Sequence, residues 1–355
     1  MNLDLKNREW KEFPVKSLFN IERGTRLIIR NRISGNIPFV TAGFQNQGVA
    51  ELIQNKEQKS FSNSITIDMF GNVFYRNYNF KCDDNIHVLT NSNINENTGN
   101  FIVNCIKKTT KDIFSYGKQF RLKTLERLKV LLPINEKSKP DYKFMQQYMR
   151  HKKQEKQKEY QEFIQNRLNQ LKKTPKTISL DQKEWIEFLL KDIFTDIQRG
   201  KRLKKADHKK GNQPYISSTG SNKGLDNYIG NKEKVRVFEN CITLANSGSV
   251  GACFYQPYSF VASDHVTKLE NNEFDKYTNL FISSLVSRLG EKYSFNREIN
   301  DKRIKKEKIL LPRNENNEPD YEFMENYMKN LEYKKLNEYL KSKSELTSSS
   351  SKSSI

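Results

Sequence analysis

Two short turns of the sequence place cations where a phosphate group could bind. Each turn contains a glycine beside basic residues, as in Arg23-Gly24-Thr25-Arg26 and Arg199-Gly200-Lys201-Arg202. Guanidinium and ammonium groups form charge-assisted hydrogen bonds to phosphate oxygens, and glycine gives the backbone conformational freedom. We interpret Arg23, Arg26, Arg199, Lys201 and Arg202 as candidate phosphate contacts. A solvated turn explains the same residues equally well.

A segment rich in amides and hydroxyls follows each turn. The two segments are Thr41-Ala42-Gly43-Phe44-Gln45-Asn46-Gln47 and Ser217-Ser218-Thr219-Gly220-Ser221-Asn222-Lys223. Such groups can pair with base edges in the major groove of DNA, and the two segments differ as two different target sequences would require. The candidate base contacts are Thr41, Gln45, Asn46, Gln47, Ser217, Ser218, Ser221, Asn222 and Lys223. An ordinary polar loop remains an equal alternative.

A third pair of stretches combines aromatic and basic residues. These are Tyr116-Gly117-Lys118-Gln119-Phe120-Arg121 and Phe295-Asn296-Arg297. Aromatic rings can contact bases, and cations contact phosphates. The candidate DNA contacts in these stretches are Lys118, Gln119, Arg121 and Arg297.

Residues for catalysis are not evident. The sequence has no Pro-Pro pair, which the Asn/Asp-Pro-Pro-aromatic motif of amino methyltransferases requires, and no GxxxxGK[ST] phosphate-binding loop. Pro140-Asp141 and Pro319-Asp320 resemble the start of a nuclease metal site, with Glu57-Gln58-Lys59 as a stray second half. Each Pro-Asp is better explained as a helix N-cap. The run Asn246 to Gly251 is better explained as a turn between strands than as a phosphate cradle.

Metal binding is not indicated either. Cys82, Cys105, Cys241 and Cys253 form no CxxC pair, and His87, His151, His208 and His265 are scattered singly. Structural roles are the simpler interpretation for all eight residues. We therefore expect no catalytic residue, no metal site and no cofactor in this chain.

The chain contains an internal repeat, which relates the candidates of the first half to those of the second. Glu9-Trp10-Lys11-Glu12-Phe13 returns as Glu184-Trp185-Ile186-Glu187-Phe188, and Val130-Leu131-Leu132-Pro133 as Ile309-Leu310-Leu311-Pro312. Pro140-Asp141-Tyr142-Lys143-Phe144-Met145 returns as Pro319-Asp320-Tyr321-Glu322-Phe323-Met324. Because the order is kept while the spacing drifts only slightly, we infer two diverged copies of one unit.

Each copy begins with short β-like runs separated by Gly and Asn turns, which predicts a mixed α/β unit. Examples of the runs are Ser64–Ile67, Asn85–Leu89 and Ile242–Leu244, with a helical stretch at 275–289. Each copy ends in a stretch without Gly or Pro that has apolar residues at helical spacing, at 142–173 and 321–343. These apolar stripes predict that the two helices pack on each other or on a partner protein.

The composition favours a polyanionic partner. Lys plus Arg number 62 against 42 for Asp plus Glu, a formal charge of +20, and both halves are basic. No apolar run of transmembrane length occurs, and residues 1–6 lack the apolar core of a signal peptide. With its unpaired cysteines, the chain is expected in a reducing cytoplasm.

The duplicated order of an α/β unit, a Leu-Leu-Pro and a Pro-Asp-Tyr-x-Phe-Met that opens a long helix resembles the specificity (S) subunits of Type I restriction-modification systems. It is especially similar to the branch that serves Type IIB and Type I-like enzymes. The resemblance covers about residues 8–343.

The resemblance implies an α+β fold with a pseudo-twofold repeat and five segments. Residues 1–135 and 180–313 would be target-recognition domains, 140–175 and 319–343 spacer helices in an antiparallel coiled coil, and 344–355 a disordered tail. Each domain would read one half of a split, asymmetric site in double-stranded DNA. The partners would be two modification subunits, which carry S-adenosylmethionine and methylate adenine, and a restriction or translocase subunit could join them.

Two other functions remain open on the sequence alone. One is a nuclease or methyltransferase component with an unrecognised active site, which would act as the purified chain alone. The other is a non-DNA interaction scaffold, whose binding would be insensitive to salt. The recognised bases, the spacer length and the subunit ratio cannot be obtained from the residues.

Overall fold

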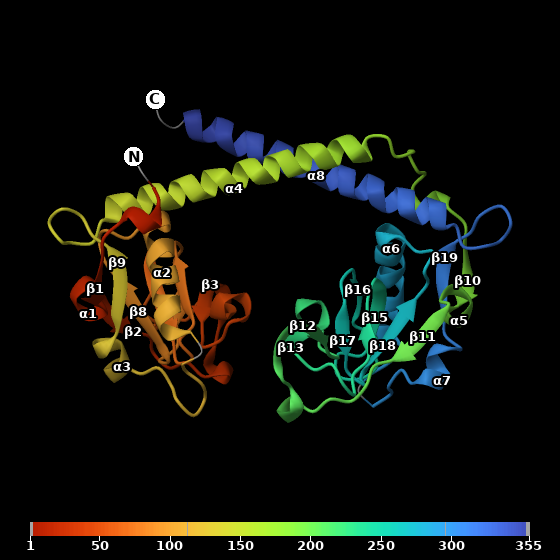
Figure 1. The fold of residues 1–355 in the computed structure, drawn as a ribbon, viewed down its shortest axis with the longest axis horizontal. Coiled ribbons are helices and arrows are strands. Elements are labelled where there is room, and N and C mark those ends of the chain that lie inside the picture. The colour runs from red at the N-terminus through yellow and green to blue at the C-terminus, as the bar shows by residue number, and fades with distance from the viewer. Residues whose placement is uncertain (1–2, 112, 295, 353–355) are drawn as a thin grey trace. The chain divides into compact units, whose positions relative to one another are not determined.

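The computed structural model describes residues 3–111, 113–294 and 296–352, with side chains described as far as residue 343. The chain divides into two compact units, residues 1–161 and 162–355, and the boundary falls within the long helix α4 (Tyr142–Leu171) (Figure 1). Both units contain nearly the same succession of strands and helices, as the internal repeat predicts.

The first unit contains three small sheets. Their strand orders are β1-β9, β4-β3-β7 and β2-β8-β5-β6, and among the described strands of this unit only β3 and β7 pair in parallel. The elements before α4 are β1 (Trp10–Pro14), α1 (Val15–Leu18), β2 (Asn20–Arg23), β3 (Ser34–Val40), β4 (Val49–Ile53), β5 (Ser64–Asp68), β6 (Val73–Arg76), β7 (Lys81–Cys82), β8 (Ile86–Thr90), α2 (Glu96–Thr110), α3 (Leu122–Arg127) and β9 (Lys129–Pro133).

The second unit repeats this plan with one more short strand. Its sheets are β10-β19, β13-β12-β17-β14 and β11-β18-β15-β16. The elements are β10 (Trp185–Leu189), α5 (Leu190–Ile193), β11 (Asp196–Arg199), β12 (Lys210–Ile216), β13 (Leu225–Ile229), β14 (Val237–Phe238), β15 (Cys241–Ala245), β16 (Cys253–Gln256), β17 (Phe260–Ala262), β18 (Val266–Glu270), α6 (Lys276–Val286), the 3-10 turn η7 (Ser287–Glu291), α7 (Asp301–Ile304), β19 (Lys308–Pro312) and α8 (Tyr321–Lys352).

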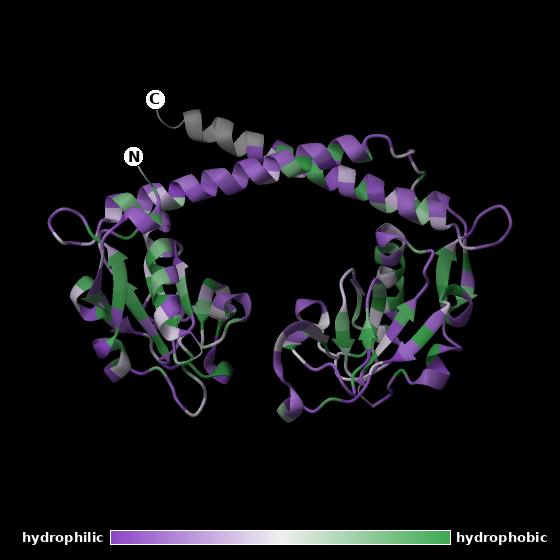
Figure 2. Ribbon diagram, viewed as in Figure 1, coloured by the Kyte–Doolittle hydropathy of each residue, from purple (hydrophilic) through white to green (hydrophobic). Residues whose placement is uncertain are grey.

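The duplicated tryptophans explain how each unit builds its core. Trp10 stacks on Phe101 of α2, and Trp185 stacks on Phe281 of α6, with ring centroids 6.2 Å apart in both pairs. The central strands β5 and β15, which contact these helices, are buried along their whole length, and green strand segments face the helices in Figure 2. No helix within the described residues is long and apolar enough to cross a bilayer.

Aspartate caps open both long helices. The Phe144 amide donates to Oδ1 of Asp141, and the Phe323 amide donates to Oδ1 of Asp320, both at 2.9 Å. A side-chain oxygen that accepts from the third residue of a helix is the standard N-cap bond. The structure therefore confirms helix capping as the role of the two Pro-Asp pairs.

The first residues of the apolar stripes of the long helices pack where the prediction did not place them. Phe144 and Met145 of α4 are fully buried, and Tyr148 meets Phe101 of α2 edge to face at 5.7 Å. The start of α4 therefore packs on the α/β body of its own unit, because α2 supplies apolar surface there. The start of α8 does the same, since Tyr327 meets Phe281 of α6 at 5.9 Å.

The end of α8 also departs from the prediction. The helix continues through Lys352, whereas we expected it to end near residue 343 and residues 344–355 to be disordered. Extending a helix that has already formed adds one hydrogen bond per residue fixed, so a polar serine run can follow it. The rest of that tail, residues 353–355, lies outside the described residues.

Candidate nucleic-acid interface

In the first unit, one end of the four-stranded sheet gathers all three predicted segments. The cationic turn follows β2, whose last residue pairs with His87 at the start of β8. The amide segment is fixed where β5 ends, because the Gly43 amide donates to Oδ2 of Asp68 at 2.8 Å. The aromatic and basic stretch joins the same place, since the Phe120 amide donates to the Met69 carbonyl at 2.8 Å. Segments far apart in the sequence thus share one surface.

The second unit gathers the equivalent segments at the turn between β15 and β16. The Gly220 amide donates to Oγ of Ser249 at 3.0 Å, and the Ser249 amide donates to the Ser218 carbonyl at 2.9 Å. From the other side, Asn246 donates its side-chain amide to the Ile299 carbonyl at 2.6 Å. The run from Asn246 to Gly251 is therefore a structural turn, as its sequence indicated.

The glycine of each cationic turn serves close packing. A Cβ on Gly24 would lie 2.3 Å from the backbone oxygens of Cys82 and Asp83, and one on Gly200 would lie 2.2 Å from that of Ser263. The turn is held there by backbone hydrogen bonds to the segment before β8 or β18. This observation replaces our interpretation of the glycine as a source of freedom, because a side chain at either position would push the turn off the sheet end.

The cations of the first turn share one carboxylate. Arg23 and Arg26 each lie 3.9 Å from Asp84, and their side chains are 59% and 72% exposed. In the second turn Arg199 pairs with Asp301 at 3.2 Å and is 30% exposed, while Lys201 and Arg202 are exposed. Ion pairs of exposed side chains are weak, so Arg23 and Arg26 are only partly neutralised by Asp84. Lys201 and Arg202 are exposed as well, and both turns therefore keep positive charge for an anion.

The apex of each amide segment has the same unusual backbone. Asn46 and Gln47 have φ of 47° and 53°, and Asn222 and Lys223 have φ of 49° and 55°. The glycines that follow, Gly48 and Gly224, also have positive φ. This tight left-handed turn points exposed side chains outward, which suits base contact. We name residues 41–48 and 217–224 the reading loops.

The comparisons with known proteins agree with this duplicated geometry. The family model described as "Type I restriction modification DNA specificity domain" matches residues 7–162 and again 182–341. The chain belongs to this family. It is 29% identical over 336 residues to the protein named Type II restriction enzyme BgcI specificity subunit S.BcgI from Heyndrickxia coagulans, which covers 92% of this chain and 95% of that protein.

Solved S subunits resemble the chain more distantly. The Type I S subunit from M. genitalium aligns over 98% of this chain and 95% of its own, with a TM-score of 0.46 and 16% identity. The HsdS subunit from Thermoanaerobacter tengcongensis aligns over 93% and 91%, with a TM-score of 0.32 and 12% identity.

Beneath the reading loops of this specificity-family chain lies an anchor that sequence reasoning missed. Arg76, at the end of β6 and 1% exposed, donates to the Gln47 carbonyl at 2.6 Å. In the second unit Gln256 occupies this place and donates to the Lys223 carbonyl at 2.8 Å. No sequence signal reveals this role, because a polar residue at the end of a strand is expected to be exposed to solvent.

The third stretch contributes exposed cations around a buried anchor. In the first unit Phe120 is 1% exposed, whereas Lys118 and Arg121 beside it are exposed and Gln119 is half-buried. Arg121 donates to Oε1 of Gln119 at 3.0 Å. In the second unit Arg297 lies over the ring of Tyr293 at 5.2 Å, and Phe295 lies outside the described residues.

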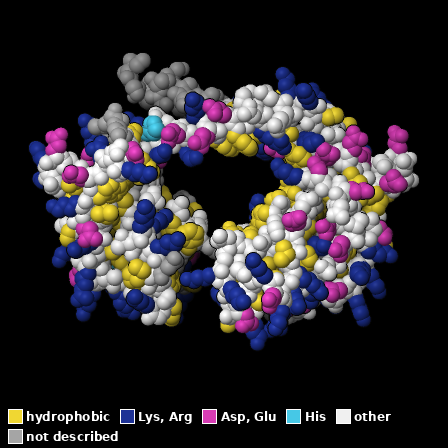
Figure 3. All heavy atoms as spheres, viewed as in Figure 1, with side chains coloured by type: hydrophobic (Ala, Val, Ile, Leu, Met, Phe, Trp, Pro, Cys, Tyr) yellow, Lys and Arg dark blue, Asp and Glu magenta, His cyan; other side chains and the backbone are white. Residues whose placement is uncertain are grey.

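The end of the sheet combines exposed positive charge with buried titratable groups that stay neutral. Lys and Arg side chains gather at the lower end of the first unit in Figure 3, where Figure 1 shows the loop between α2 and α3. Burial, together with Arg23, lowers the pKa of His87 to about 4, and burial raises that of Cys82 to about 12. Within the described residues no group of His, Cys, Asp or Glu could hold a metal ion.

Proposed function

We propose that this chain is the DNA-recognition subunit of a restriction-modification enzyme and that each unit reads one half of an asymmetric, bipartite site. Family membership establishes the specificity subunit, which does not itself catalyse. The observation that supports the division of labour is the convergence, in each unit, of a cationic turn, a reading loop and a basic stretch at one end of a sheet.

The two reading loops support an asymmetric site. Both have the same backbone turn, but Phe44-Gln45 in the first corresponds to Gly220-Ser221 in the second, and Gln47 corresponds to Lys223. A glutamine amide suits adenine, which offers a donor and an acceptor, whereas a lysine suits guanine, which offers two acceptors. The halves of the site should therefore differ in sequence.

The long helices are proposed to set the spacing as an antiparallel coiled coil. Support comes from contacts within the second unit, where the end of α4 meets α8. Arg167 pairs with Glu332 at 2.9 Å, and Asn330 donates to the Pro175 carbonyl at 2.8 Å. The polar face of α4, purple in Figure 2, leaves charged surface on this helix for partner subunits.

Methyl transfer is proposed to be catalysed by partner subunits. Two modification subunits would bind the chain, one for each unit, and would hold the S-adenosylmethionine that supplies the methyl group to adenine. A restriction or translocase subunit could complete the assembly.

An exchange of domains tests the proposal. Residues 185–312 are replaced with those of another family member, and the host genome is sequenced for methylated adenine with and without the chain. We expect one half of the methylated motif to change and the other to persist. A change in both halves would contradict the assignment of one unit to one half-site.

A further inference from the structure

An exposed leucine is repeated in both units, far along the chain from the reading loops. Leu131 in β9 is 50% exposed and Leu310 in β19 is 52% exposed, and both are the first leucine of the duplicated Leu-Leu-Pro motif. Many other exposed apolar positions are not shared, since Ile29 corresponds to Lys205 and Phe44 to Gly220. Two diverged units that both keep an apolar residue in water indicate a shared contact.

These leucines lie on a strand edge that is open in each unit. Among the described strands, β9 pairs with β1 alone and β19 with β10 alone. In an antiparallel pair, the backbone groups of alternate residues point toward the partner strand. Val15 donates to the Leu128 carbonyl, and Ile134 donates to the Glu9 carbonyl, which sets the alternation in the first ribbon. The N–H and C=O groups of Lys129 and Leu131 therefore point away from β1.

The second ribbon has the same polarity. Leu190 donates to the Glu307 carbonyl, and Arg313 donates to the Glu184 carbonyl, so the backbone groups of Lys308 and Leu310 point away from β10. Among the described residues, none forms a hydrogen bond with these groups in either unit. A row of unpaired N–H and C=O groups is a template for one more strand.

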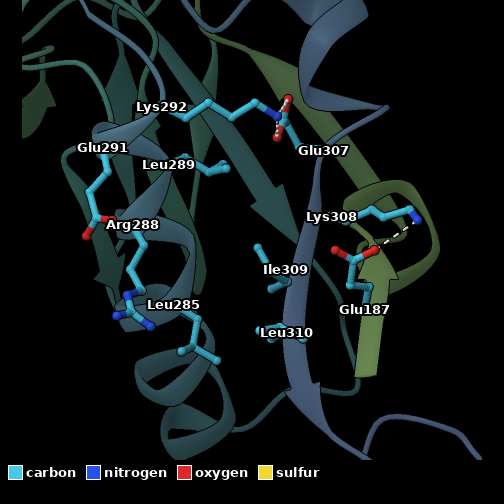
Figure 4. Close-up of a pocket in the computed structure, with 10 residues that line it drawn as sticks. All are labelled: Glu187, Leu285, Arg288, Leu289, Glu291, Lys292, Glu307, Lys308, Ile309 and Leu310. Carbon is cyan, nitrogen blue, oxygen red and sulfur yellow. Dashed lines mark hydrogen bonds and ion pairs between the residues drawn. The ribbon is translucent and has the colours of Figure 1, made fainter. Parts of the chain in front are cut away.

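A groove with an apolar floor borders the open edge of β19. Figure 4 shows Ile309 and Leu310 on one side of this groove, with Leu285 and Leu289 on the other. An equivalent groove in the first unit is lined by Phe114, Leu128 and Lys129, among others. The groove offers a place for apolar side chains of an added strand.

The rim of both grooves carries the same ion pair. Lys129 lies 3.4 Å from Glu12, and Lys308 lies 3.0 Å from Glu187, with all four side chains more than half exposed. A glutamate beside an exposed leucine repels phosphate, which argues against DNA here. An acidic residue opposite the lysine and an apolar residue opposite the leucine would form favourable cross-strand pairs.

We infer that the open edges of β9 and β19 are equivalent docking sites for an extended segment of the modification subunit, which adds one strand to each ribbon. The segment presents an apolar residue to the leucine and an acidic residue to the lysine. This inference rests on the proposed function, because it assigns the two sites to the two modification subunits. One copy of the same partner for each unit explains why the duplicated units keep the same edge.

Amide hydrogen exchange tests the docking sites in the wild-type chain. The exchange is measured for the chain alone, with duplex DNA that contains its site, and with the modification subunit of the same system. We expect the amides of Lys129, Leu131, Lys308 and Leu310 to be slowed at least tenfold by the modification subunit and unchanged by DNA. Amides that exchange equally fast in the complex, or that are already protected by self-association of the chain, would overturn the inference.

Proline substitution tests the stoichiometry. Leu310→Pro removes one outward N–H and leaves the bonds to β10 intact, as proline on a strand edge does. Leu189→Pro is the matched control, because it removes an outward N–H on the other edge of the same ribbon, opposite Lys308, where the first unit has Pro14 opposite Lys129. Native mass spectrometry should count one modification subunit per chain for Leu310→Pro and two for the control.

Leu131→Pro should likewise leave one modification subunit, and the double variant none. Each variant is first shown to be folded by its wild-type affinity for DNA. A folded double variant that still takes two modification subunits would refute the docking sites. Loss of the proposed function would be seen separately, as a wild-type chain that binds no specific DNA.

Discussion

Replacing Arg76 should loosen the first reading loop and leave the second unchanged. Its guanidinium donates to Thr66 Oγ1 at 3.0 Å, to the Tyr78 hydroxyl at 2.8 Å and to the Gln47 carbonyl at 2.6 Å. Arg76 forms no ion pair with a described residue, and burial lowers its pKa. The rings of Phe74 and Phe80 at 5.7 and 5.4 Å partly stabilise the cation.

The loss of folding stability depends on which side chain replaces Arg76. Arg76→Ala loses all three bonds, which leaves buried acceptors unsatisfied and a cavity, so we expect about 3–5 kcal/mol of destabilisation. Arg76→Gln installs the side chain that the second unit uses, where Gln256 contacts both Thr243 and the Lys223 carbonyl. It loses one hydrogen bond and removes a buried charge, so about 0–1.5 kcal/mol is expected.

Two measurements check this prediction. Thermal unfolding gives the ranking of the variants, and amide exchange across residues 41–48 shows whether the reading loop is loosened. Methylation sequencing should then show relaxed preference at one half-site for Arg76→Ala and a wild-type motif for Arg76→Gln. If Arg76→Gln is as damaging as Arg76→Ala, the anchor depends on the charge and the comparison with Gln256 fails.

Three further predictions follow from single contacts. Arg23→Ala and Arg199→Ala should weaken binding to all DNA sequences, and each should reduce the slope of log affinity against log salt by about 0.9, with unchanged slopes removing the phosphate assignment. Because the pKa of His87 is lowered to about 4, its neutral form stabilises the fold above pH ~6.5, and this stability falls by up to about 1.4 kcal/mol per unit as the pH drops toward 4. Acid titration followed by amide exchange should therefore open the first unit before the second, where Thr267 replaces the histidine, and His87→Gln should abolish the difference. Asp320→Ala should cost about 1–2 kcal/mol in calorimetry through loss of the helix cap, and no change in melting would contradict that role.

Much of the fold could be predicted from the sequence because the units are duplicated. The strands at Ser64–Asp68 and Cys241–Ala245 were expected from their β-branched residues, and the caps at Asp141 and Asp320 from their position before helix formers. Local signals of this kind depend on a few neighbouring residues, which the printed sequence contains.

Contacts between distant segments could not be predicted in the same way. Nothing near Gly24 in the sequence says that Cys82 and Asp83 lie against it, so its requirement for close packing was read as freedom. The role of Arg76 as an anchor could not be predicted either, because it depends on the Gln47 carbonyl, which only the folded chain brings next to the guanidinium. The first part of the apolar stripe of α4 was assigned to another helix or a partner protein for the same reason, since the surface of α2 became available only in three dimensions.

The two units show how one scaffold can serve two target sequences. The backbone of each reading loop is fixed from below, by a buried amide or guanidinium donor and by a following glycine with φ near +80°. Its side chains above are exposed and make few contacts with the body of the unit. A substitution at Gln45 or Ser221 would then alter the surface that we propose meets DNA, at little cost to folding. Different residues hold each reading loop and face outward from it. The outward residues, and with them the proposed base preference, can therefore change while the sheet end that carries the loop stays the same.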